Sequence, residues 1–150
     1  MDRGERAAQL FLQGYNCAQA VAVAFSDLTG ISPELSAKMA SSFGGGMGRL
    51  REVCGAVSGM LLVTSLLYGY DKPEDTQGKK ELYALVQSLA EQFRQQNGSI
   101  ICRELLNNPP SDPNPSPRTA EYYAKRPCCK MVMTAAKLLD EFIAEHPLEG

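Results

Sequence analysis

The sequence predicts an all-α protein, a compact bundle of about five to seven helices with no sheet. Apolar residues recur at intervals of three and four through most of the chain, which is the spacing of one face of a helix. Residues that favour helix starts, and glycine or asparagine residues that favour helix ends, flank several of these segments. No segment sustains the alternation of apolar and polar residues that is typical of a half-buried strand.

A single domain is expected to span residues 1–150, a length that buries roughly 70% of the surface of the unfolded chain. Hydrophobic residues make up 44% and charged residues 21%, as in ordinary globular proteins. The formal charge of −2 gives no electrostatic reason to expect a nucleic-acid partner. The longest apolar run, Met60 to Leu67, is far shorter than the about 20 residues that a membrane span needs.

The first residues lack the continuous apolar stretch and the cleavage site of a secretory signal, so a cytoplasmic protein is expected. Cysteines in a reducing compartment are more often reduced, metal-bound or redox-cycling than joined in permanent disulfides. The five cysteines of this chain are therefore interpreted in these terms.

Two apolar stripes at helical spacing run through the first half of the chain, and each contains a cysteine that is expected to face inward. The stripes are Leu10, Gly14, Cys17, Val21 and Ala24, and Leu50, Cys54, Val57, Leu61 and Thr64. Between them, Ser32-Pro33-Glu34 predicts the start of a helix that stops at Gly44, because serine caps helices and proline suits their first position. A glycine-rich loop then leads into a helix from about Arg49 to Tyr68.

The second half of the chain predicts a long helix from Lys79 to Gln96, which ends at Asn97-Gly98. A short helix carrying Cys102 follows. Residues 107–117 contain five prolines and cannot continue a helix, so a surface loop is expected there. One or two helical turns over residues 119–125 precede a final helix, with Pro127 at its first position, that extends through Glu145.

Four cysteines are distributed singly along the chain, at Cys17, Cys54, Cys102 and Cys128, each in or beside a predicted helix. If the helices bring all four together, their thiolates could bind an iron–sulfur cluster or zinc, for which four thiolates are a standard ligand set. A labile cluster could be lost on purification. The local Cys-x-x-Cys spacing of zinc ribbons and ferredoxins is missing, so each ligand would come from a separate helix.

Thiol–disulfide cycling is the second interpretation of the same cysteines. Cys54 follows the glycine-rich loop and is the exposed candidate for the reactive thiol. Cys102 is the second candidate redox thiol, because it lies near a predicted helix start, where free N–H groups lower the pKa of a thiol, as does Cys128. Four cysteines allow three complete pairings, and the sequence does not choose among them.

The glycine-rich loop has three interpretations of its own. Its backbone N–H groups could approach the sulfur site through Gly44, Gly45, Gly46, Gly48 and Gly55. Together with Arg49 and Arg51 the loop could instead bind an anion, although neither nucleotide-binding glycine pattern is satisfied. The glycines could also serve only a tight turn and close helix packing.

These motifs, taken together, resemble the C_GCAxxG_C_C family of redox-active proteins. The resemblance rests on Tyr15 to Val21, Phe43 to Arg49 with Val53 to Gly59, Ile101 to Leu106, and Cys128 to Leu139. It implies a small helical fold and a redox role, in some members beside transporter genes or joined to electron-transfer domains. Cys129 stands where the family often has proline and is the candidate for an unpaired thiol.

The leading prediction is a redox-active protein in which Cys17, Cys54, Cys102 and Cys128 converge, with metal or cluster binding slightly preferred to disulfide cycling. The partner would be an unknown redox protein or a transporter, and a homo-oligomer is conceivable. The alternative is a non-catalytic helical accessory protein in which the cysteines are simply buried. The single histidine, His146, lies near the C-terminus, which argues against histidine-dependent hydrolysis.

Overall fold

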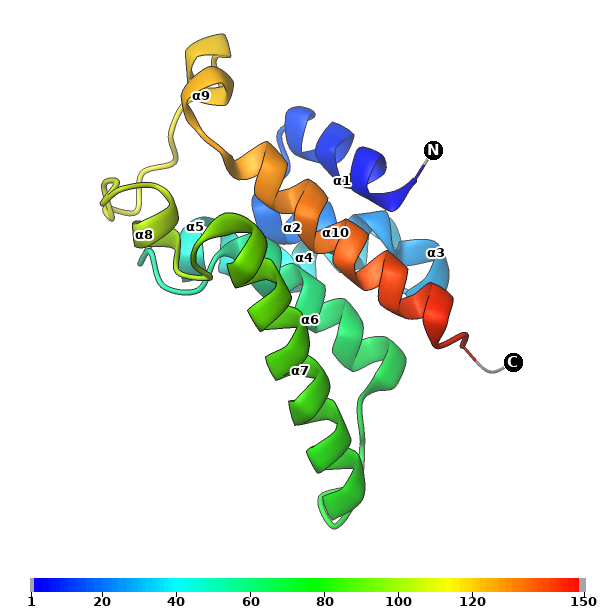
Figure 1. Ribbon diagram of the computed structural model, residues 1–150. Coiled ribbons are helices and arrows are strands. Elements are labelled where there is room, and N and C mark those ends of the chain that lie inside the picture. Colours follow the sequence, from blue (N-terminus) through cyan, green and yellow to red (C-terminus); the bar gives the residue numbers. More distant parts are fainter. Residues whose placement is uncertain (1, 149–150) are drawn as a thin grey trace.

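The computed structural model describes residues 2–148 and is an all-α bundle (Figure 1). Within these residues the six helices with eight or more residues are α1 (Arg3–Leu12), α2 (Cys17–Ala24), α4 (Pro33–Ala40), α6 (Gly55–Tyr68), α7 (Thr76–Asn97) and α10 (Cys128–Glu145). The shorter elements are α3 (Ser26–Thr29), the 3₁₀ turn η1 (Ser41–Phe43), α5 (Gly44–Met47), α8 (Cys102–Leu105) and α9 (Ala120–Lys125). The predicted helical class is confirmed: among residues 2–148 a single isolated bridge, Val53 to Ile101, is the only pairing of strand type.

The centre of the bundle is α2, which packs against α1, α4, α6 and α10. Its sequence is apolar on every side, and all of its residues from Ala20 to Ala24 are buried. A helix that is hydrophobic all round is stable only when other elements surround it. The largest side chains of the surrounding core are Phe11, Phe25, Phe93, Met60, Leu89 and Leu139.

The long helix α7 extends away from the rest of the bundle (Figure 1). Only Leu89 and Phe93, near its C-terminal end, are buried among its 22 residues. This end contacts α6 and α10. Among residues 2–148 no helix combines the length and the apolar character that crossing a membrane would require.

Two predicted helices differ in the structure. The stripe that contained Leu10 and Cys17 is divided between α1 and α2 by a turn at Gly14, whose φ of 110° is left-handed. The helix predicted from Arg49 begins only at Gly55. Arg49 and Arg51 have left-handed φ values of 67° and 63°, which a right-handed helix cannot contain.

The remaining elements follow the predictions closely. The helix that begins at Pro33 has Ser32 as its N-cap. It ends at Ala40, and the 3₁₀ turn η1 continues the chain to Gly44, where the predicted helix stops. The long helix ends at Gly98, which adopts the expected left-handed conformation. The proline-rich residues 107–117 form a loop, as predicted. Pro127 was predicted to be the first residue of the last helix. In the structure it is the N-cap of α10, so this helix begins one residue later.

Candidate functional site

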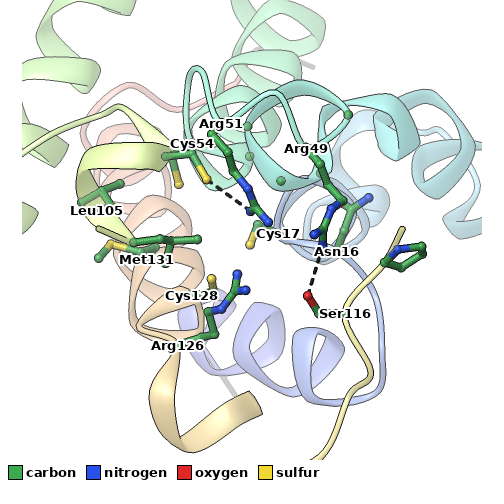
Figure 2. A pocket seen from close by; sticks show the side chains of 18 of the residues that line it. Asn16, Cys17, Arg49, Arg51, Cys54, Leu105, Ser116, Arg126, Cys128 and Met131 are labelled. Carbon is green, nitrogen blue, oxygen red and sulfur yellow. Dashed lines mark hydrogen bonds between the residues drawn. The ribbon is translucent and has the colours of Figure 1, made fainter. Parts of the chain in front are cut away.

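The four predicted cysteines lie at the starts of four helices. Cys17, Cys102 and Cys128 are the first residues of α2, α8 and α10, and Cys54 is the N-cap of α6. All four line one cavity of about 310 Å³ (Figure 2). Helix starts carry N–H groups without intrahelical partners, so this cavity is formed where backbone donors are concentrated. The predicted convergence of the cysteines on one cavity is therefore present.

Backbone contacts between two distant segments bring Cys54 and Cys102 to the same side of the cavity. The amide of Cys54 donates to the carbonyl of Ile100 at 2.7 Å, and the amide of Cys102 donates to that of Glu52 at 2.6 Å. The isolated bridge between Val53 and Ile101 lies between these two bonds. The loop that replaces the start of the predicted helix is thus fixed to the segment that carries the third cysteine.

The glycines predicted to approach the sulfur site, Gly44, Gly45, Gly46, Gly48 and Gly55, all line this cavity. At Gly46, with φ at 70°, an added Cβ would lie 2.6 Å from Cβ of Cys102. At Gly55 it would lie 3.2 Å from Cβ of Cys17. At these two positions the missing side chain is what lets the cysteine helices come close to the loop.

Four arginines also line the cavity, and its lining contains no aspartate, glutamate, lysine or histidine. Arg51 is the most buried of them, with 4% of its surface exposed. Its Nη1 donates to Sγ of Cys102 at 3.7 Å and its Nε donates to the carbonyl of Pro110 at 2.9 Å. Its Nη2 is buried and has no hydrogen-bond partner.

The other three arginines have different partners. Arg49 holds the proline-rich loop over the cavity, donating to the carbonyl of Asp112 at 2.8 Å and to Oγ of Ser116 at 3.1 Å (Figure 2). Arg118 donates to the carbonyls of Phe11 and Tyr15. Arg126 lies over the ring of Tyr122 at 5.1 Å, and its side chain has neither a hydrogen bond nor an ion pair within residues 2–148.

The thiols of Cys17 and Cys128 line the same cavity and influence each other's pKa. Hydrogen bonding from the Cys17 thiol lowers the pKa of Cys128 to about 7, and burial opposes this shift. The positive charges of Arg126, Arg118 and Arg51 lower the pKa of Cys128 further. The same hydrogen bond, together with burial, raises the pKa of Cys17 well above its ordinary value. Near neutral pH this pair therefore loses its first proton, and the lowered pKa of Cys128 favours the negative charge on that sulfur.

The other two cysteines differ from the pair. Cys54 is only 6% exposed, so the expectation of an exposed thiol at this position is wrong. Its burial raises its pKa to about 12, although the N–H groups of Ala56 and Val57 act in the opposite direction. Burial also raises the pKa of Cys102, and the hydrogen bond from Arg51 only partly offsets it. Both thiols are therefore protonated at neutral pH.

All five cysteines are free thiols in this structure. Within residues 2–148 no three cysteine, histidine, aspartate or glutamate side chains are grouped closely enough to hold a metal ion. The four cysteines share a cavity without forming a ligand cage, so in this arrangement they do not fit a cluster or zinc. Cys129 is not part of the cavity lining and packs partly buried against the core.

The sequence analysis did not identify Arg118 and Arg126 as part of the site. Arg126 precedes Cys128 by two residues, and a cation so close to a cysteine at a predicted helix start was a signal that was available. No comparable signal existed for Arg118, because it reaches the cavity only through contacts with α1 and the following turn. Tyr122 also lines the cavity.

The fold and the cavity together define a small helical protein with clustered thiols. Residues 15–142 match the family described as "Putative redox-active protein (C_GCAxxG_C_C)". Because the match covers most of the chain, the protein belongs to this family, and the resemblance drawn from its motifs is confirmed. No curated protein and no solved structure matches the chain.

Proposed function

We propose that the protein is a thiol–disulfide redox protein in which Cys128 is the reactive thiolate and Cys17 is the resolving thiol. The observation that carries this proposal is that these two thiols line one cavity together with Arg51, Arg118 and Arg126, whose positive charges lower the pKa of Cys128. A nucleophilic thiolate with an adjacent second thiol is the arrangement that disulfide exchange requires. Neither of the candidates from the sequence, Cys54 and Cys102, has this combination.

The reaction would proceed in two exchanges. The thiolate of Cys128 attacks one sulfur of an external disulfide and displaces the other sulfur as a thiolate, which takes up a proton from solvent. Cys17 then gives up its proton and attacks Sγ of Cys128, which closes a Cys17–Cys128 disulfide and releases the second external thiol. Two electrons pass from the protein to the external disulfide, and the reverse sequence returns the protein to its dithiol form.

Ligation of an iron–sulfur cluster or zinc by Cys17, Cys54, Cys102 and Cys128 receives less support than exchange. Within residues 2–148 these side chains are not grouped closely enough to hold a metal ion. The raised pKa values of Cys17, Cys54 and Cys102 also oppose the deprotonation that metal ligation needs. The shared cavity is the one observation in favour of a four-thiolate site. Ligation therefore remains a second, independently testable candidate.

The experiment that tests the proposal is disulfide mapping after equilibration in redox buffers of defined potential. We expect the oxidised protein to lose two hydrogens reversibly and to yield a Cys17–Cys128 crosslink in peptide mass spectra. Cys17→Ser and Cys128→Ser should each abolish the crosslink, whereas Cys54→Ser and Cys102→Ser should preserve it. A crosslink that depends on Cys54 or Cys102 instead would contradict the assignment.

Anaerobic purification followed by visible spectroscopy and metal analysis separates the remaining alternatives. Charge-transfer bands with stoichiometric iron, or stoichiometric zinc, would replace the exchange proposal with ligation. Absence of both metal and any reversible two-hydrogen change would favour the accessory-protein alternative, in which the cysteines have only a packing role.

A further inference from the structure

The cavity that contains the cysteines carries more positive charge than its thiols can balance. Among residues 2–148 four arginines and no acidic side chain line it, and of these arginines only Arg49 pairs with an acid in the same residues, Asp112. One thiolate, on Cys128, would offset a single positive charge. Because the whole chain has a formal charge of −2, the positive charge of this cavity does not follow from the net charge of the protein.

Arg51 is the side chain that points most directly to a ligand. A guanidinium group carries five N–H donors, and leaving one buried without a partner costs free energy. Nη2 of Arg51 is such a donor, on a side chain that is 96% buried and that extends into the cavity in Figure 2. The backbone around it is also held in an uncommon conformation, with Met47, Arg49 and Arg51 all left-handed. An anion in the cavity would supply the missing acceptor.

Arg126 provides a second cationic group across the cavity. In Figure 2 the side chains of Arg51 and Arg126 extend toward the centre from opposite sides, with Cys128 and Cys17 between them. Arg126 has no ion pair within the described part of the chain, and its contact with the ring of Tyr122 leaves its N–H donors available. Two guanidinium groups arranged in this way suit carboxylates, which arginine binds with paired hydrogen bonds.

The rest of the lining argues for an organic ligand with a hydrocarbon portion. Leu105, Leu106 and Met131 give the cavity an apolar part, and in Figure 2 Leu105 and Met131 lie on the same side of it. A volume of about 310 Å³ is at the lower end of the range for small-molecule sites and is larger than a simple inorganic oxyanion needs. Charged donors beside an apolar wall suit a short aliphatic chain that ends in an anionic group.

We propose that this cavity binds a small carboxylate-bearing organic disulfide, with its carboxylates on Arg51 and Arg126 and its hydrocarbon against Leu105 and Met131. This inference rests on the proposed function for the reaction, since the disulfide is the oxidant in the exchange described above. The anion site itself rests on the arginines and stands independently of the exchange.

The first test compares three linear disulfides of similar size and different charge: dithiodipropionate, which is a dianion, hydroxyethyl disulfide, which is neutral, and cystamine, which is a dication. The rate of Cys17–Cys128 disulfide formation with each disulfide is divided by the rate at which that disulfide reacts with 3-mercaptopropanol, a thiol that differs from the halves of all three disulfides, which corrects for intrinsic reactivity. We expect the normalised rate to be at least about tenfold higher for the dianion than for the neutral compound, and lowest for the dication.

Variants test whether the arginines cause this preference. Arg51→Met should reduce the ratio of the dianion rate to the neutral rate at least about fivefold, and a general effect on the thiolate cancels in that ratio. Arg126→Gln tests the same point if Arg51→Met does not fold. Lys125→Gln is the matched control, because Lys125 pairs with Glu121 outside the cavity, and it should leave the ratio unchanged. Equal normalised rates for all three disulfides would overturn the inference while leaving the proposed exchange intact.

A second test measures binding without any reaction. Suberate has the length of dithiodipropionate, with methylene groups in place of both sulfurs. Hexanediol replaces the sulfurs of hydroxyethyl disulfide in the same way and is the neutral control. Calorimetry should detect binding of suberate that weakens in Arg51→Met and no comparable binding of hexanediol. Suberate binding in a protein that forms no disulfide would retain the anion site and reject the exchange. No difference between suberate and hexanediol would reject the anion site.

Discussion

Cys128 and Cys54 occupy similar positions in the cavity and have opposite acid–base properties. Each of the four thiols lies at a helix start, where backbone donors and the helix dipole favour a thiolate. Yet the pKa of Cys128 is lowered to about 7, and that of Cys54 is raised to about 12. The difference follows from their neighbours: Cys17 and three arginines lower the pKa of Cys128, whereas burial dominates at Cys54.

This contrast shows that a helix start alone does not make a cysteine reactive. Cys54 caps a 14-residue helix, and the N–H groups of Ala56 and Val57 do favour its thiolate, but desolvation outweighs them. At Cys128 desolvation acts in the same direction and is outweighed instead. The charged and hydrogen-bonding groups contributed by other parts of the chain decide which thiol ionises.

The largest expected effect is the difference in alkylation between these two thiols. At pH 7, pKa values of about 7 and about 12 give thiolate fractions that differ more than 10⁴-fold, and the greater intrinsic reactivity of the more basic thiolate offsets about 100-fold of this. We therefore expect iodoacetamide, which is small and uncharged, to modify Cys128 at least about 100-fold faster than Cys54. Time-resolved peptide mass spectrometry measures both rates.

The control for this experiment is Cys129, which shares a tryptic peptide with Cys128. Burial raises the pKa of Cys129, so fragment spectra should place the early modification on Cys128 alone. Cys54→Ser should leave the rate at Cys128 unchanged. Early labelling of Cys54 or Cys129 would contradict the assignment of Cys128 as the most reactive thiol.

A smaller effect, on the free energy of unfolding, is expected when a side chain is added at Gly46, on the side of the cavity that holds Cys102. Gly46→Ala should reduce the free energy of unfolding by about 2–4 kcal/mol, because it combines a left-handed φ with a Cβ placed 2.6 Å from Cβ of Cys102. Gly48→Ala is the matched control: φ there is also left-handed, but the nearest atom to the added Cβ is 3.7 Å away. Its expected cost is about 1 kcal/mol.

Urea unfolding of both variants measures this difference. Equal losses would mean that the two glycines serve only the backbone conformation of the loop. In that case the close approach of the loop to Cys102 would not depend on the absence of a side chain at Gly46.

The smallest effect isolates the hydrogen bond within the reactive pair. Cys17→Ala removes the donor, so the pKa of Cys128 should rise from about 7 toward the ordinary thiol value of about 8.5. Cys17→Ser retains a hydroxyl donor and should keep the pKa closer to that of the native protein, although it cannot form the disulfide. The midpoint of the pH profile of iodoacetamide alkylation at Cys128 measures the shift.

Other groups also face this thiol. Arg51, Arg118 and Arg126 lower the pKa of Cys128, and the charge of Cys128 raises the pKa values of Cys54, Cys102 and Tyr122. Since all of them are present in both variants, the difference between alanine and serine at position 17 reports on the hydrogen bond. Identical midpoints in the two variants would show that the arginines alone account for the low pKa.

Local patterns were sufficient to predict the helical class, the caps at Ser32 and Gly98 and the proline-rich loop. They failed at residues 49–54, where apolar spacing suggested a helix that the left-handed backbone of Arg49 and Arg51 excludes. Those two arginines are held by partners in residues 100–118, about 50 or more positions away in the chain. Contacts over such distances are not expressed in local spacing.

The amino-acid order by itself placed Cys102 and Cys128 near helix starts, because caps, prolines and apolar spacing act over a few residues. The helix starts at Cys17 and Cys54 were not predicted and emerged only in the folded structure. Which thiol is acidic, which is inert and where an anion would bind depend on Arg51, Arg118 and Arg126, which come from three separate segments. Electrostatic and desolvation effects depend on distance in space and on burial, and these exist only once the helices have packed.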